Sequence, residues 1–248
     1  MTERIRLDLA LEQRGLVPSR ARARDAILRG TVTINGIAAT KPHQMVGPAD
    51  KLALSDPAAN YVSRAALKLV AGLDAGGIDP SGKTCLDVGA STGGFTQVLM
   101  ERGAARIYAV DVGHDQLHAR LKGSTRVASM EGVNARDLTP ELIPEPIDLL
   151  VSDISFVSVT KVLAASLALC TSDADAVILF KPQFEVGRQN IGKGGIVTDE
   201  AAIATALAEV IAFVTAQGFA HRLSVTSPIV GGDGNLETVL VFARSDRD

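Results

Sequence analysis

Residues 83–90 read KTCLDVGA, an apolar run that ends in an acid, a valine and a glycine before the chain turns. Similar apolar runs recur downstream, at 105–113 (ARIYAVDVG), 148–156 (DLLVSDISF) and 176–182 (AVILFKP). Helical patterns lie between the runs, at 95–102 and 162–169. A regular alternation of strand and helix is typical of a mostly parallel sheet covered by helices on both faces. The sequence therefore predicts an α/β fold whose functional residues lie at the carboxyl ends of the strands.

The composition is that of a globular protein. The chain has 248 residues, 46% of them hydrophobic, and every long apolar stretch is interrupted by charges. Its first residues, MTERIRLDLALEQRG, lack the apolar core of a secretory signal, so we expect a cytoplasmic protein without a membrane span. The two cysteines, Cys85 and Cys170, lie in apolar surroundings without metal-ligand spacing. We therefore expect no metal site, and we expect a monomer.

The charge is divided unequally along the chain. Residues 1–56 contain nine basic and six acidic residues, whereas the rest contains 16 basic and 22 acidic ones. Helical patterns at 5–15 and 19–30 precede TVTING, a strand ending in the hairpin signal Asn35-Gly36, and return strands are expected within 37–54. The small, Pro-containing segment 55–62 reads as a linker. We predict a domain boundary near residue 60, within this linker, with one domain over 1–59 and a second over 60–248.

The first domain resembles a known RNA-binding module. Arginines flank the apolar stripe of the helix at 19–30, which alone fits an ordinary solvent-facing helix. The whole string RLDLALEQRGLVPSRARARDAILRGTVTING, however, resembles the α+β S4 domain in its RLD start, its SR helix start and its VxxNG hairpin. That resemblance implies docking on structured RNA through phosphate contacts. The candidate RNA-binding residues are Arg4, Arg6, Arg20, Arg22, Arg24, Lys41 and Arg64, with Arg188 and Lys193 farther along the chain.

The loop after the first strand of the larger domain predicts a cofactor site. Asp87-Val88-Gly89 begins a glycine-rich turn, and Asp111 ends the next strand near the offset of a ribose-binding acid. The loop lacks the G-x-G-x-x-G register of dinucleotide enzymes, and Asp87 would repel a pyrophosphate. S-adenosylmethionine, which is cationic and has no phosphate, fits better. The predicted cofactor-binding residues are Asp87, Gly89, Ala90, Ser91, Thr92, Gly93, Gly94, Phe95, Asp111, Asn134, Ala135 and Asp153.

Two lysines and two carboxylates on separate elements are candidates for methyl-transfer chemistry. A hydroxyl is a poor nucleophile until a base takes its proton, and a lysine held in an apolar site beside a second ammonium is a suitable base. Lys181 ends the run VILFK, and Asp153 ends LLVSD. Lys68 lies in a helical segment that begins at Ser63, and Glu237 precedes the final strand. Each also fits an ordinary structural role: an exposed helix lysine, a strand-end cap or a solvent-facing strand residue.

These four residues carry a second resemblance. In the order Lys-Asp-Lys-Glu they match the tetrad of the FtsJ-like ribose 2'-O-methyltransferases, which implies a Rossmann-like, S-adenosylmethionine-dependent fold with Lys181 as the central base. With the S4-like start, the whole chain resembles the TlyA (hemolysin A) family. That family implies methylation of cytidine 2'-hydroxyls in 16S or 23S ribosomal RNA, or both. The loop GASTGG lacks the proline usual in FtsJ enzymes, which leaves its shape open.

Other functions remain possible from the sequence. Asp153-Ile154-Ser155-Phe156 stands where amino-methylating enzymes have an acid, two prolines and an aromatic residue, but both prolines are absent. A ribosome-assembly factor without activity would not need the tetrad. Direct hemolysis has no apolar span to support it, because 201–219 reads as a helix packed on the sheet. The glycine-rich stretch EVGRQNIGKGGIVTDE, residues 185–200, reads as a mobile lid, with an ordinary surface loop as the alternative. Near its end, Thr198 is expected to cap the helix that follows.

Overall fold

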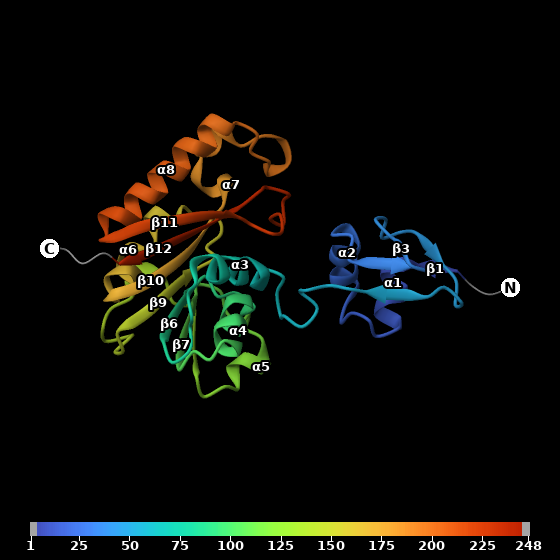
Figure 1. Ribbon diagram of the computed structural model, residues 1–248, viewed down its shortest axis with the longest axis horizontal. Coiled ribbons are helices and arrows are strands. Elements are labelled where there is room, and N and C mark those ends of the chain that lie inside the picture. Colours follow the sequence, from blue (N-terminus) through green and yellow to red (C-terminus); the bar gives the residue numbers. More distant parts are fainter. Residues whose placement is uncertain (1–3, 245–248) are drawn as a thin grey trace. The chain divides into compact units, whose positions relative to one another are not determined.

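The computed structural model describes residues 4–244, and the fold consists of two compact units that divide between Asn60 and Tyr61 (Figure 1). The smaller unit contains two helices and two small sheets. Its helices are α1 (Leu7–Gln13) and α2 (Arg20–Leu28), and its strands are β1 (Ile5–Arg6), β2 (Val32–Ile34), β3 (Ile37–Ala38), β4 (Met45–Val46) and β5 (Leu52–Leu54).

The smaller unit has its own core. Leu7, Leu11, Ile27 and Val32 are fully buried where α1 and α2 pack on the strands. Asn35 and Gly36 both have positive φ, 52° and 82°, as the hairpin signal requires, and β2 pairs with β3 and β5. The sequence did not predict the pairing of β1 with β4, because each strand has only two residues.

The larger unit is built on a seven-stranded sheet in the order β11-β12-β10-β9-β6-β7-β8. Strands β6 to β10 are parallel, and β12 inserts antiparallel between β10 and β11. The strands are β6 (Thr84–Val88), β7 (Arg106–Asp111), β8 (Val127–Glu131), β9 (Ile147–Ser152), β10 (Cys170–Phe180), β11 (Phe219–Thr226) and β12 (Thr238–Arg244). Chain order reverses between β6 and β9, which is where open α/β sheets bind ligands.

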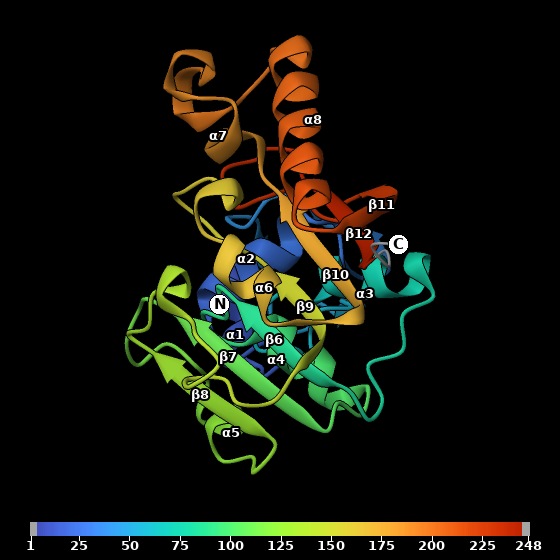
Figure 2. The same cartoon turned by 90° about the vertical axis from the view of Figure 1, so that its left-hand side faces the viewer.

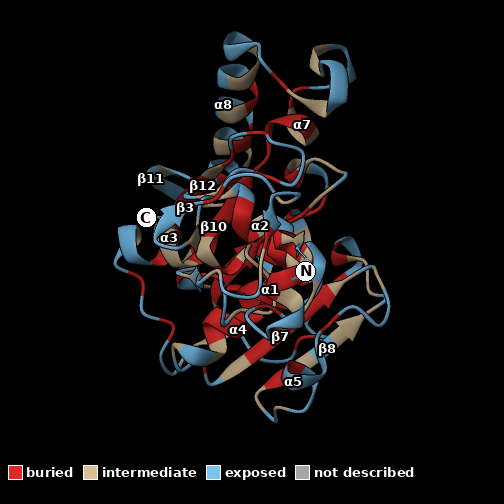
Figure 3. Cartoon of the chain, turned by 90° about the vertical axis from the view of Figure 1, so that its right-hand side faces the viewer, coloured by how far each residue is buried: buried red, intermediate tan, exposed pale blue. Residues whose placement is uncertain are grey.

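Helices cover both faces of this sheet (Figure 2). On one face α3 (Ala66–Gly76), α4 (Gly94–Glu101) and α5 (Ala119–Lys122) pack over Cys85, Val151 and Val177. On the other face α6 (Ala164–Ala168) and α8 (Glu200–Ala216) pack over Leu86 and Leu150. Because successive strand residues point to opposite faces, each central strand is apolar on both sides. Figure 3 shows the buried residues following these central strands.

Short helical turns occupy the remaining connections: η1 (Ala135–Asp137), η2 (Val159–Lys161), α7 (Pro182–Glu185), η3 (Arg188–Asn190) and η4 (Lys193–Gly195).

Two helix starts differ from the sequence pattern. The helix expected from Ser63 begins at Ala66, and the hydroxyl of Ser63 accepts from the Ala65 amide instead. Asp199, rather than Thr198, caps α8 by accepting from the Ala202 amide. Before α3, the amides of Ala66 and Leu67 bond to the carbonyls of Ser63 and Arg64, three residues back, so a tighter turn precedes the α-helix. Before α8, the neighbouring Thr198 and Asp199 are both suitable capping residues.

Candidate active site

The strand register brings three of the four tetrad positions to one edge of the sheet. Ser152 pairs with Ile178 in the parallel ladder, and Phe180 pairs with Thr238 in the antiparallel one. Asp153, Lys181 and Glu237 each lie one residue beyond these pairs. Residues at the ends of neighbouring strands are necessarily close, so sheet topology assembles a site from segments far apart in the sequence.

Lys181 is a buried amine with polar partners. It is 7% exposed, and its Nζ lies 2.7 Å from Asp153 Oδ1 in an ion pair. The same nitrogen donates to Ser155 Oγ at 2.6 Å and, at 3.4 Å, to the Asp153 carbonyl oxygen. Pro182 begins α7 immediately afterwards, so the chain turns away and leaves the side chain at the strand end. The lysine is held in the site and does not extend to solvent.

Lys68 and Glu237 form a second buried pair. Lys68 Nζ lies 2.5 Å from Glu237 Oε2, and the two residues are 6% and 2% exposed. A Cβ at Gly231 would lie 2.6 Å from Glu237 Oε1, so the absence of a side chain there makes room for the carboxylate. Each lysine of the predicted tetrad thus has its own carboxylate, which lowers the cost of burying four charges.

The glycine loop is held in a defined shape by Asp111. The carboxylate of Asp111 accepts from the Ser91 amide at 2.8 Å and from the Gly113 amide at 2.7 Å. Gly89 has a φ of 85°, and a Cβ there would lie 3.0 Å from the Asp153 carbonyl oxygen. Only glycine combines this conformation with so close an approach of the two strand ends.

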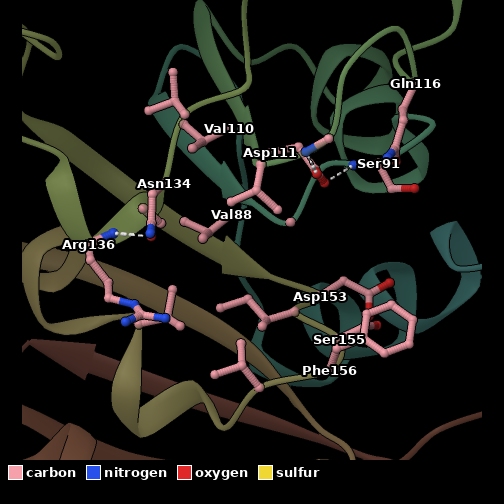
Figure 4. A pocket seen from close by; sticks show the side chains of 18 residues that line it. Val88, Ser91, Val110, Asp111, Gln116, Asn134, Arg136, Asp153, Ser155 and Phe156 are labelled. Carbon is pink, nitrogen blue, oxygen red and sulfur yellow. Dashed lines mark hydrogen bonds between the residues drawn. The ribbon is translucent and has the colours of Figure 1, made fainter.

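A pocket of about 500 Å³ opens beside this loop, within the range of small-molecule sites (Figure 4). Six predicted cofactor residues line it: Gly89, Ser91, Asp111, Asn134, Ala135 and Asp153. A smaller adjoining pocket is lined by four others: Ala90, Thr92, Gly94 and Phe95. In Figure 4, Asp153, Ser155 and Phe156 form one wall, while Asn134 and Arg136 form another.

Two predicted cofactor residues lie outside both linings. Gly93 is buried with a φ of 96°, and a Cβ there would collide with Leu121. Asp87 is fully buried and accepts from Thr96 Oγ1 at 2.6 Å, while its Oδ1 has no partner among the described residues. Burial raises the pKa of the Asp87 carboxyl to about 7, and the charges of Asp153 and Asp111 add to this effect. Direct contact of Asp87 with a cofactor stays a prediction.

The raised pKa of Asp87 predicts a pH dependence of stability. The unfolded carboxyl ionises near 3.8, whereas the folded one keeps its proton to about 7, so the native state binds more protons between these values. The stability contribution of Asp87 therefore falls as pH rises through this window, by up to about 4 kcal/mol. Urea unfolding from pH 4 to pH 8 should show this fall in wild type relative to Asp87→Asn. A difference between the two proteins that does not change with pH would contradict it.

The candidate RNA-binding residues fall into two groups. Arg4, Arg20, Arg24, Lys41, Arg188 and Lys193 are exposed, whereas Arg6, Arg22 and Arg64 are partly buried. Arg6 and Arg20 both pair with the buried Asp8, at 2.9 and 3.0 Å. Burial by itself raises the pKa of Asp8, but hydrogen bonds from Arg6 and Arg20 outweigh it and lower that pKa to about 2. These two guanidiniums are thus fixed in place, and their contact with RNA stays a prediction.

The loop expected to be a lid is anchored at its carboxyl-terminal end. Asn235 is 2% exposed, and its side chain accepts from the Val197 amide at 2.9 Å and donates to the Gly195 carbonyl at 2.8 Å. The segment before it, with the turns η3 and η4, carries exposed Arg188 and Lys193. Asn235 lies two residues before Glu237, so the segment that holds this end of the loop also carries a residue of the tetrad.

Several pocket residues were not predicted from the sequence as site residues. Ser155 and Phe156 line the pocket, and Phe156 is 91% exposed with a φ of 71°. Arg136 and Gln116 line it from η1 and from the loop before α5. In the segment Asp153-Ile154-Ser155-Phe156, the sequence predicts a site role for Asp153 alone. The signal in the sequence was an aromatic residue, Phe156, shortly after the acid that ends an apolar run, which could have identified this wall.

Two family descriptions match the chain. The FtsJ-like methyltransferase family matches residues 61–244, and the S4 domain family matches residues 5–52. The 16S/23S rRNA (cytidine-2'-O)-methyltransferase TlyA of Mycobacterium tuberculosis is 44% identical over 97% of this chain and 90% of its own length. Hemolysin A of Brachyspira hyodysenteriae is 38% identical over 96% and 99%, respectively. Within residues 4–244, no helix is both long and apolar enough to cross a membrane.

Solved structures agree with these matches. A candidate hemolysin from Streptococcus thermophilus superposes with a TM-score of 0.76 and 34% identity, covering 99% of this chain and 90% of its own. An S-adenosylmethionine-dependent methyltransferase from Mesorhizobium loti, 16% identical with a TM-score of 0.51 over 72% and 98%, shares the fold. The predicted α/β fold is confirmed. From these matches over nearly its full length, the chain belongs to the FtsJ-like methyltransferase family and carries an S4 domain before the methyltransferase domain.

Proposed function

We propose that this protein transfers a methyl group from S-adenosylmethionine to the ribose 2'-hydroxyl of cytidine in ribosomal RNA. In this proposal residues 1–59 bind RNA, and residues 60–248 bind the cofactor and carry out the transfer. The observation that carries the proposal is the pair of ion pairs at the strand ends, Lys181 with Asp153 and Lys68 of α3 with Glu237, in which both lysines are buried. The TlyA relative whose printed name states this activity supports it.

The pocket fits S-adenosylmethionine chemically. The backbone amides of Ser91 and Gly113 each donate to one oxygen of the Asp111 carboxylate. Each carboxylate oxygen has a further lone pair that can accept from a ribose hydroxyl. Asp111 and Asp153 place negative charge around the loop. The buried Asp87, whose pKa is raised to about 7, keeps an oxygen unpartnered among the described residues, and a cation nearby would favour its charged form. A cation is the ligand that such a site favours. Val110, Val133 and Val162 supply apolar walls for a purine.

Each polar residue has a separate task in this proposal. When bound, the cofactor supplies an electrophilic methyl group. Asp111 and Asn134, which line the large pocket, would hold its nucleoside part, and residues of the glycine loop would hold the rest. Lys181 in its neutral form receives the proton of the 2'-hydroxyl, and the Asp153 carboxylate 2.7 Å away stabilises the ammonium that results. The Lys68–Glu237 pair lies at the end of β12, next to the strand end that carries Lys181, and we expect its two charges to contribute to the transfer as members of the tetrad.

The test is the site of the methyl group. When the purified protein is incubated with methyl-labelled cofactor and with ribosomal subunits from a strain lacking the gene, the label should appear on a ribose. The phosphodiester bond after the modified cytidine should then resist alkaline cleavage. Subunits and bare RNA should be compared, because an S4 surface recognises shape. Label on a base would exclude the proposed reaction, and binding of the cofactor without transfer would indicate an assembly factor.

Salt dependence tests the RNA-binding residues. Arg24 is exposed on α2, and we expect Arg24→Ala to weaken subunit binding and to reduce the slope of log affinity against log salt by about 0.7 to 0.9, the value for one phosphate contact. Filter binding between low and moderate salt measures both quantities. Arg222→Ala, which removes an exposed arginine from β11, is the matched control and should leave the slope unchanged. Equal slopes for Arg24→Ala and wild type would remove Arg24 from the interface.

A further inference from the structure

Ser155 lies between Lys181 and the pocket. Its side chain accepts a hydrogen bond from Lys181 Nζ at 2.6 Å, and Ser155 lines both the large and the small pocket. Lys181 lines neither pocket, and its side chain is only 8% exposed. A hydroxyl that approaches from the pocket therefore meets Ser155 and Asp153 before it meets the lysine amine.

The hydrogen of the Ser155 hydroxyl is not committed elsewhere in the described structure. Its Oγ has Lys181 Nζ as its hydrogen-bond partner there, and in that bond the serine is the acceptor. A hydroxyl donates one hydrogen bond and accepts others, so it serves a lysine in either charge state. Toward an ammonium it accepts, and toward a neutral amine it donates to the lone pair. Asp153, as a carboxylate, only accepts and favours the ammonium.

We propose that Ser155 relays the proton of the ribose 2'-hydroxyl to Lys181. This inference rests on the proposed function and adds a catalytic residue to it. The 2'-oxygen gives its proton to Ser155 Oγ while the Ser155 hydroxyl proton passes to Lys181 Nζ. The 2'-oxygen bonds to the methyl carbon as the sulfur–methyl bond breaks, and that electron pair stays on sulfur. With Lys181 as the ammonium, its bond to Ser155 Oγ is the arrangement after transfer.

The relay predicts a specific pattern of variants. Ser155→Ala should lower the single-turnover rate at least ~100-fold, the usual effect of losing a proton-transfer group, whereas Ser155→Thr keeps a hydroxyl and should stay within about tenfold of wild type. Cofactor affinity by calorimetry and the melting temperature should be unchanged in Ser155→Ala. Rates in mixtures of light and heavy water should give a curved dependence for wild type, because two protons move together.

The outcomes separate this inference from the proposed function. A Ser155→Ala rate close to wild type, or a linear dependence on heavy-water fraction in wild type, overturns the relay while the 2'-O-methyl product still stands. A loss of activity with weakened cofactor binding or a lowered melting temperature also overturns it, because the serine would then be structural. The relay is supported if the single-turnover rate is lost in Ser155→Ala and recovered in Ser155→Thr, and if the wild-type rate depends on the heavy-water fraction along a curve. Absence of ribose methylation in wild type would reject the proposed function itself.

Discussion

Replacing Lys181 with alanine should lower the rate of methyl transfer about 10²- to 10⁴-fold, the contribution of a positioned base, while cofactor affinity stays close to wild type. The reason is the location of the amine: its partners are Asp153 and Ser155, and it does not line the pocket. Single-turnover transfer to ribosomal subunits gives the rate, and calorimetry gives the affinity.

The control for this variant is Lys161→Ala, which removes an exposed lysine from η2 and should leave both quantities unchanged. Enzymes that methylate an exocyclic amine do not need a lysine base. Activity near wild type in Lys181→Ala would therefore reject the 2'-hydroxyl mechanism and favour base methylation.

Breaking the Lys68–Glu237 pair should cost more stability than removing it entirely. Lys68→Met leaves a buried carboxylate without its cation, and Glu237→Gln leaves a buried ammonium without its anion. Each single variant should lose roughly 3–5 kcal/mol of unfolding free energy, whereas the double variant should recover most of that loss. Urea unfolding of the four proteins at one pH gives the coupling energy.

Activity separates the two roles of this pair. If the pair only supports the fold, the double variant should regain methyl transfer together with stability. Our proposal gives Lys68 and Glu237 a place in the tetrad, so the stable double variant should remain slow. Additive losses of stability in the double variant would show that the two side chains do not interact in solution.

The sequence predicted the sheet, the pocket loop and the strand-end positions because these depend on local patterns. Apolar runs ending in Asp87, Asp111 and Asp153 indicate parallel strands whose ends share an edge. The membership of the tetrad came from family resemblance. Which lysine pairs with which carboxylate could not be predicted, because Lys68 and Glu237 are 169 residues apart and meet only through β12.

Other features also depended on tertiary contacts. Ser155 carried no local signal of its role, since its significance arises from Lys181 on another strand. The bond from Asn235 to the loop at Gly195 joins segments 40 residues apart. Arg22, predicted for RNA, donates to the Ala58 carbonyl at 2.9 Å, a contact that requires the return of the chain after β5.

The position of β12 between β10 and β11 affects how the protein is made. This strand follows β10 and β11 in the chain, and until it inserts, the side of β10 that faces away from β9 has no strand to pair with. Lys68 leaves the ribosome 169 residues before its carboxylate partner, so in the nascent chain its ammonium must remain hydrated. The predicted tetrad is therefore complete only after Glu237 has been added, and a chain that ends before this residue would keep the S4 domain but lack one member of the tetrad.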